Sequence, residues 1–131
     1  MCMKHLIIAV DFDGTIVEDA YPFIGKPQMF AFETLQKFQS EGHRLILWTY
    51  RSGSKLEEAL DFCSKNNITF YAVNKSFPEE KLNKKNSRKI NADIFIDDRN
   101  IGGFLGWTAI YKTVLNTEPI LKKKCFFSFF R

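Results

Sequence analysis

Four aspartates stand in two short groups, and their side chains could bind a metal ion or attack a phosphate. Asp11 and Asp13 flank Phe12, and Asp97 and Asp98 are adjacent near the other end of the chain. Either group alone is compatible with an ordinary turn or a loop cap. Four carboxylates brought together would repel one another, and they are the hard oxygen ligands that Mg²⁺ prefers. We therefore expect a magnesium site if the fold unites the two groups.

Both aspartate groups follow segments with the pattern of buried strands. Residues 6–10 form a continuous apolar run rich in β-branched side chains, which is typical of a strand covered on both faces. Further strands are predicted at residues 44–48, 70–73 and 93–96. A strand at the start of the chain also explains residues 4–10 better than a signal peptide does, because Asp11 and Asp13 end the apolar run at once.

Helical spacing separates these strands. The first predicted helix follows Pro27 and carries an apolar stripe of Met29, Phe30, Phe32, Leu35 and Phe38. The second opens on a predicted capping box from Ser54 to Glu57 and continues through Leu56, Ala59, Leu60 and Cys63. A closing helix is marked by Trp107, Ile110, Tyr111 and Val114. Alternating strands and helices predict a three-layer α/β domain of Rossmann-like form with a mostly parallel sheet.

A parallel sheet gathers the residues that follow its strands at one edge, where ligands bind. Thr49, Tyr50 and Arg51 would stand there beside the aspartates, and so would Arg99. Gly14 permits a sharp turn that could return Asp13 to the same pocket. The residues predicted to contact substrate are Gly14, Thr15, Tyr50, Arg51 and Arg99. For Arg51 and Arg99 the sequence leaves two roles open, a phosphate contact or an ion pair with a neighbouring acid.

The segment Asp11-Phe12-Asp13-Gly14-Thr15 resembles the first signature of the haloacid dehalogenase superfamily of phosphatases. Thr49 after an apolar strand resembles the second signature, Lys89 the third, and Ile96-Asp97-Asp98 the acidic fourth. The resemblance spans residues 6–100 and implies the strand order 3-2-1-4. It is strongest to short members whose last signature runs into Asp-Asp-Arg, some of which are nucleotidases.

The resemblance also implies roles for these residues. Asp11 would be the nucleophile, Asp13 the general acid and base, and Thr49 a donor to the phosphoryl oxygens. Lys89 would neutralise the phosphorylated aspartate, with Lys85 as the alternative. The metal ligands would be Asp11, Asp13 through its main-chain carbonyl, and Asp97 or Asp98. Phosphoryl transfer depends chiefly on positioning and on neutralising charge, which Mg²⁺, a lysine and a threonine can supply.

The resemblance implies a capless member, since only residues 16–26 separate the predicted loop from the first helix. Such a site is open, and a protein partner or an oligomer would be a means of closing it. The substrate would be a nucleotide or another small phosphorylated metabolite. The rival interpretation is a phosphate-binding or phosphoacceptor module without turnover, which would have no use for Asp13.

The net charge of +4 lies in the last ten residues. Lys122, Lys123, Lys124 and Arg131 leave 15 basic against 15 acidic residues in positions 1–121. We therefore predict a phosphohydrolase domain over residues 1–121 and a basic, phenylalanine-rich tail over residues 122–131. The tail would allow weak contact with an anionic membrane surface. Nucleic acid is not expected as a partner. The odd number of cysteines fits a reducing cytoplasm better than a disulfide framework.

Overall fold

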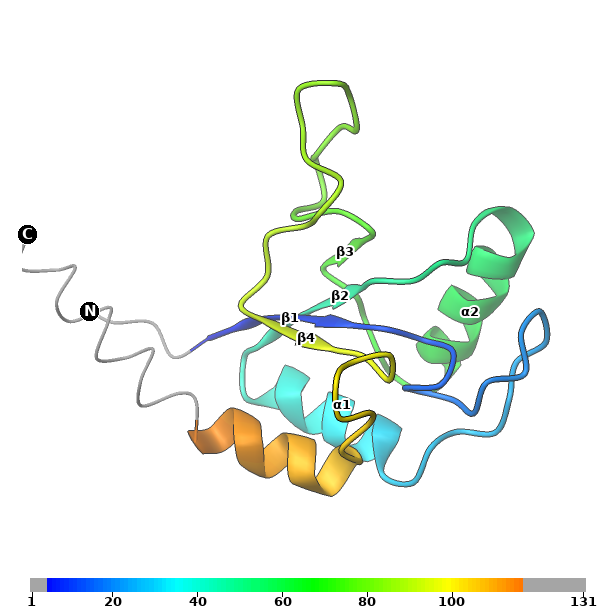
Figure 1. Cartoon of the computed structure of the whole chain (residues 1–131), viewed down its shortest axis with the longest axis vertical. Helices are drawn as coiled ribbons and strands as arrows, with labels where there is room; N and C mark the ends of the chain where they lie inside the picture. Colours follow the sequence, from blue (N-terminus) through cyan, green and yellow to red (C-terminus); the bar gives the residue numbers. More distant parts are fainter. Residues whose placement is uncertain (1–4, 117–131) are drawn as a thin grey trace, which may run out of the picture.

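The computed structural model describes residues 5–116, in which four parallel strands form one sheet in the order β3-β2-β1-β4 (Figure 1). The strands are β1 (Ile7–Val10), β2 (Arg44–Leu47), β3 (Ala72–Val73) and β4 (Ile94–Ile96). β1 lies in the interior of the sheet between β2 and β4. The predicted α/β Rossmann-like fold, its strand order and the lack of a cap domain within residues 5–116 are confirmed.

The central strands form because their side chains are apolar on both faces of the sheet. Ile8, Ala9 and Val10 of β1 are all buried, and they pair in register with Leu45, Ile46 and Leu47 of β2, which are also buried. A strand covered on both sides tolerates no polar side chain in its run. β1 therefore ends where the aspartates begin.

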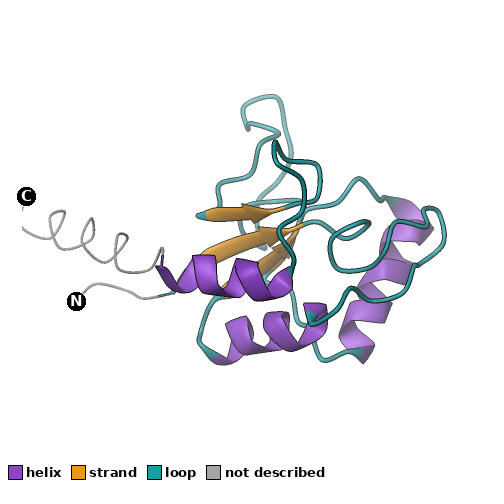
Figure 2. Ribbon diagram, turned by 60° about the horizontal axis from the view of Figure 1, so that its bottom comes forward, coloured by secondary structure: helices purple, strands orange, loops and turns teal. Residues whose placement is uncertain are grey.

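Three helices pack on the same face of the sheet (Figure 2). They are α1 (Ala31–Ser40), α2 (Gly53–Lys65) and a third helix that covers residues 107–116 of the described chain. Their buried apolar side chains share one core with Ile8 and Val10 of β1. The helix residues in this core are Phe32, Leu35, Phe38, Ala59, Cys63, Trp107, Ile110 and Val114.

The other face of the sheet is covered by an irregular crossover. A second apolar cluster joins Ala9, Ile46 and Ala72 to Ile90, which belongs to the segment of residues 74–93 between β3 and β4. This segment contains no helix, and part of it projects from the body of the protein (Figure 1). The layer opposite the helices is therefore a loop.

Two predictions about helix starts are wrong. α1 begins at Ala31, and Phe30 before it adopts a left-handed φ of 65°, so Met29 and Phe30 lie exposed outside the apolar stripe. α2 begins at Gly53 after Ser52, and no side chain caps it, so the predicted capping box from Ser54 does not form at its start. Of the predicted stripe, Phe32, Leu35 and Phe38 are buried in α1, together with Ala31 and Thr34.

Three of the predicted strands are shortened at their starts, and β3 keeps only Ala72 and Val73 of residues 70–73. The strand predicted at residues 44–48 ends one residue earlier, at Leu47. The domain limit predicted at residue 121 and the predicted tail lie outside the described residues. Within residues 5–116, no helix combines the length and the apolar character that crossing a bilayer requires.

Candidate active site

The site lies at the carboxyl edge of the sheet, where β1, β2 and β4 end beside one another. Asp11 follows β1, Trp48 and Thr49 follow β2, and Asp97 follows β4. These residues line an open pocket of about 610 Å³. The full lining is Asp11, Asp13, Asp19, Tyr21, Trp48, Thr49, Tyr50, Asp97 and Arg99.

Three of the four predicted aspartates form one cluster, and two of them, Asp11 and Asp97, line this pocket. Asp11, Asp97 and Asp98 each offer a carboxylate oxygen, and these oxygens all lie within 4.8 Å of one another. The pKa of Asp11 is raised to about 7, first because burial removes its carboxyl from water and then because Asp97 and Asp98 are so near. The surroundings of Asp11 therefore disfavour its charged form.

The donor chemistry of this cluster fits a small, hard divalent cation. Carboxylate oxygens are the ligands that Mg²⁺ takes, and a cation would relieve the repulsion that raises the pKa of Asp11. Asp97 has a structural role as well, because its Oδ1 accepts the backbone N–H of Arg99 at 2.8 Å. Asp97 can therefore cap the loop after β4 and still offer an oxygen to a metal ion.

The loop after β1 is held so that it can approach the cluster. Gly14 adopts φ 85°, and a Cβ at this position would collide with the Asp98 carboxylate. Thr15 Oγ1 lies 3.3 Å from Oδ2 of Asp11 and 3.3 Å from Oδ1 of Asp98. The carbonyls of the loop are also held, because Trp107 Nε1 donates to Thr15 O at 2.9 Å and Gln28 Nε2 donates to Gly14 O at 3.4 Å.

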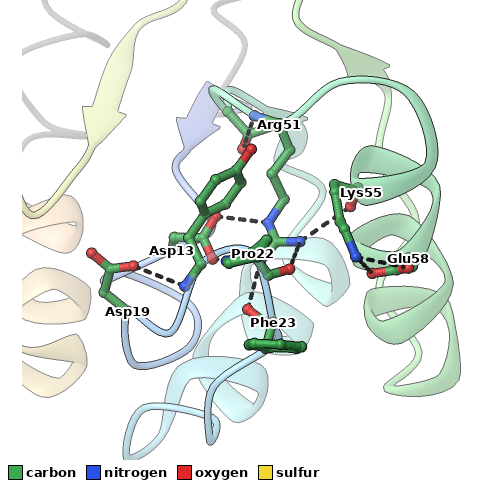
Figure 3. Close-up of polar contacts among 9 residues, drawn as sticks. Asp13, Asp19, Pro22, Phe23, Arg51, Lys55 and Glu58 are labelled. Carbon is green, nitrogen blue, oxygen red and sulfur yellow. Dashed lines mark hydrogen bonds and ion pairs between the residues drawn. The ribbon is translucent and has the colours of Figure 1, made fainter.

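Asp13 points to a different partner, the guanidinium of Arg51 (Figure 3). Arg51 Nε donates to Asp13 Oδ2 and Nη2 donates to Asp13 Oδ1, both at 2.7 Å, which makes a bidentate ion pair. The carboxylate of Asp13 is therefore not a member of the Asp11 cluster.

Every N–H of the Arg51 guanidinium is used. Nη1 donates to the carbonyls of Pro22 and Lys55, and the second N–H of Nη2 donates to the carbonyl of Phe23. The side chain is buried, with Arg51 only 1% exposed. Of the two roles open for Arg51, the structure has the ion pair with an acid, and no donor is left for a substrate phosphate.

Thr49 and its neighbours occupy the wall next to β2. The backbone N–H of Thr49 donates to Asn74 Oδ1 at 2.8 Å, and Thr49 Oγ1 accepts the backbone N–H of Arg51 at 3.1 Å. The hydroxyl hydrogen of Thr49 thus stays available to a ligand. Tyr50 and Arg99 also line the pocket, so both predicted contact residues lie where a ligand would meet them.

The structure does not bring the predicted lysine into the pocket. Lys89 is exposed on the crossover, with its Nζ 5.8 Å from the centroid of the Phe95 ring. Lys85 lies four positions earlier in the same segment, is exposed too, and is not among the lining residues. Among the residues that the structure describes, Arg99 is the only one with a cationic side chain that lines the pocket.

Sequence reasoning missed three residues that hold this site in place, namely Gln28, Asn74 and Trp107. Each acts on the backbone of a site loop through its side chain. Trp107 was assigned to the core by its spacing, and nothing in that spacing indicates a bond to a carbonyl 92 positions away. Asn74 had a weak signal, since a polar residue after an apolar strand falls at the carboxyl edge.

The fold and this site define an α/β protein with a Rossmann-like parallel sheet and an acidic cluster at its carboxyl edge that could bind a metal ion. A solved structure of a conserved protein from Bacteroides thetaiotaomicron is similar to it, with a TM-score of 0.81 and 51% sequence identity. The match covers 86% of this chain and 92% of the other. The chain belongs to the same family as that conserved protein. No protein-family model and no curated protein matches the chain.

Proposed function

We propose that this protein is a Mg²⁺-dependent phosphomonoester hydrolase in which Asp11 is transiently phosphorylated, as its resemblance to haloacid dehalogenase phosphatases implies. One observation carries the proposal. Asp11, Asp97 and Asp98 form one carboxylate cluster, of which Asp11 and Asp97 line an open pocket, and Asp13, two residues from Asp11, lines the same pocket. A nucleophile and a separate acid–base group are what this reaction needs from the protein.

The chemistry has two steps. In the first, an Asp11 oxygen bonds to phosphorus while the bond from phosphorus to the ester oxygen breaks, and the leaving oxygen takes a proton from Asp13. In the second, Asp13 takes a proton from water, which bonds to phosphorus as the Asp11–phosphorus bond breaks. Thr49 would donate its hydroxyl hydrogen to a phosphoryl oxygen, and Arg99 would face the phosphate charge.

A bound Mg²⁺, held by Asp11, Asp97 and Asp98, would offset the charge that the phosphate and the carboxylates bring together. The remaining requirements fall on the chain itself. Position 14 must be a glycine, because a larger residue would collide with Asp98. The hydrogen bonds that Trp107 and Gln28 donate to the carbonyls of the loop must keep it in place.

The ion pair of Asp13 sets a further condition. With both oxygens accepting from Arg51, Asp13 is arranged as the carboxylate that takes a proton from water in the second step. The first step needs the same group carrying a proton. We infer that substrate binding loosens the contact between Asp13 and Arg51 before the leaving oxygen is protonated.

The test is phosphate release from a panel of small phosphomonoesters with Mg²⁺, after chelation, and after Mg²⁺ is added back. Wild-type protein should turn over repeatedly, lose activity with the chelator and regain it with the metal. Asp11→Asn should lose activity by at least about a thousandfold, because the nucleophile is gone. The matched control is Asp61→Asn, which makes the same chemical change in an exposed pair with Lys65 on α2.

Three results would count against the proposal. Activity that survives the chelator removes the metal role, and activity in Asp11→Asn removes the nucleophile. A stable phosphorylated protein that never turns over would favour the phosphoacceptor interpretation. Circular dichroism of each variant shows whether the fold is intact, so that a loss of activity can be assigned to the site.

A further inference from the structure

The mouth of the pocket is aromatic, although its floor is acidic. Tyr21, Trp48 and Tyr50 line the pocket together with its carboxylates. Carboxylates, a metal ion and hydrogen-bond donors suffice for handling a phosphoryl group. Trp48 also packs against the second apolar cluster, so Tyr21 and Tyr50 are the side chains that need a separate explanation.

Tyr21 and Tyr50 contact each other edge to face at this mouth. Their ring centroids lie 6.2 Å apart with the planes at 70°, and the two residues come from different segments, the loop after β1 and the turn after β2. Tyr50 is 90% exposed and Tyr21 is 48% exposed. Single exposed aromatic residues are ordinary, but here two meet at the entrance of the site where Asp11 lies.

The two rings differ in how firmly they are held. The Tyr21 ring lies over the Arg51 guanidinium, with the central carbon 5.2 Å from the ring centroid, and the Tyr21 backbone N–H donates to Asp19 Oδ1 at 3.3 Å. Arg51 is itself buried and fully bonded. Tyr21 is thus a fixed wall, whereas the exposed Tyr50 ring can turn from edge contact to lie flat against a ligand.

We propose that this mouth binds the leaving group of the substrate, and that the leaving group carries a flat aromatic ring. The inference rests on the proposed phosphohydrolase function. A pocket of about 610 Å³ exceeds what a phosphoryl group needs and lies within the range of small-molecule sites. Stacking on Tyr50 holds such a ring by its face, while Asp11 meets the phosphate at the floor.

The test compares two phosphomonoesters that differ in the flatness of one ring. Benzyl phosphate and cyclohexylmethyl phosphate are both esters of primary alcohols with the same number of carbon atoms, so the chemical step is similar. Wild-type protein with Mg²⁺ should show a kcat/KM about fivefold or more higher for benzyl phosphate. Tyr50→Ala should bring the ratio of the two values close to one, and Tyr50→Phe should keep it.

Phe77→Ala is the matched control, because Phe77 is also a partly exposed aromatic residue but lies outside the pocket. This variant should keep the wild-type ratio. Equal kcat/KM for both esters in wild-type protein, or an unchanged ratio in Tyr50→Ala, would overturn the proposal that the mouth binds an aromatic leaving group. Either result would leave the hydrolase function in place.

Binding separates this inference from the function on which it rests. Benzylphosphonate and cyclohexylmethylphosphonate cannot be hydrolysed at the carbon–phosphorus bond, and calorimetry with Mg²⁺ measures their affinities. Tighter binding of benzylphosphonate that is lost in Tyr50→Ala, without turnover of either ester, would overturn the hydrolase function and not the ring preference. Equal affinities would overturn the ring preference.

Discussion

Arg51 forms the most buried ion pair within the described residues, and its side chain joins three parts of the chain. It is bonded to Asp13 after β1, to the carbonyls of Pro22 and Phe23 in the following loop, and to the carbonyl of Lys55 in α2. A guanidinium can do this because its donors form a rigid planar fork, which an ammonium group lacks. Arg51 therefore positions Asp13 without touching the substrate.

We predict that replacing Arg51 is costly to the fold. Arg51→Ala leaves Asp13 without its partner and removes the Arg51 donors from three carbonyls, so the free energy of unfolding should fall by about 3–5 kcal/mol. Arg51→Lys should recover only part of this, because one ammonium cannot reach all the acceptors. Urea denaturation measures both.

The control for Arg51 is the exposed pair of Lys65 and Asp61, whose closest atoms are 2.9 Å apart. Lys65→Ala should change the free energy of unfolding by no more than about 1 kcal/mol, since both side chains remain solvated. If Arg51→Ala costs no more than Lys65→Ala, the buried pair does not stabilise the protein.

At the scale of elements, the irregular crossover between β3 and β4 carries both lysines considered for the site. It covers the second apolar cluster through Ile90 and then leads into β4, which delivers Asp97 and Asp98. Lys89 precedes Ile90 directly, and its amine lies beside the Phe95 ring. Along the chain, Lys89 is therefore nearer than Lys85 to β4 and to the aspartates that follow it.

We predict that Lys89→Ala lowers kcat/KM far more than Lys85→Ala does. A cation that neutralises a phosphorylated aspartate contributes a factor of about 100 or more, and only the lysine that reaches Asp11 on substrate binding can supply it. Phosphate release by the two variants measures the ratio.

The reverse ranking would assign the role to Lys85. Small and equal losses would mean that neither lysine acts, and that Arg99, the described cation already in the pocket, carries the charge compensation. Since both lysines are exposed, both alanine variants should fold like the wild type, and equal melting temperatures would check this.

At the scale of the whole molecule, the acidic cluster couples metal binding and pH to stability. The pKa of Asp11 is about 7 in the folded protein against an ordinary value of 3.8. A carboxyl whose pKa is raised by folding stabilises the fold while it is protonated, and this contribution is fully present below the ordinary value. It is lost as the pH rises towards 7.

We therefore predict that metal-free wild-type protein loses stability relative to Asp11→Asn as the pH rises from about 4 to about 7. The difference between the two proteins isolates Asp11, because their other titrating groups are shared. Mg²⁺ at about pH 8 should raise the melting temperature of the wild type and raise that of Asp11→Asn less. A parallel pH dependence in the two proteins, or no response to Mg²⁺, would contradict the charge repulsion and the metal site respectively.

Much of the architecture was predictable because it depends on local patterns. The apolar runs ending at Asp11 and Asp97 identified strands, and strands alternating with helices predicted a parallel sheet. In such a sheet the residues after the strands must meet at one edge. The convergence of Asp11, Asp97 and Asp98 thus follows from the sequence through the topology alone.

What the sequence by itself determined is therefore which residues reach the carboxyl edge. The apolar pattern of neighbouring positions is enough to identify each strand and the residue at which it ends. Only the tertiary structure decided what each polar group there touches. Arg51 pairs with Asp13, 38 positions away, because the loop after β1 and α2 bring acceptors to all of its donors at once. The same holds for the bond from Trp107 to Thr15 and for the place of Lys89 beside Phe95. Such contacts depend on how distant segments pack, and no local pattern carries that information.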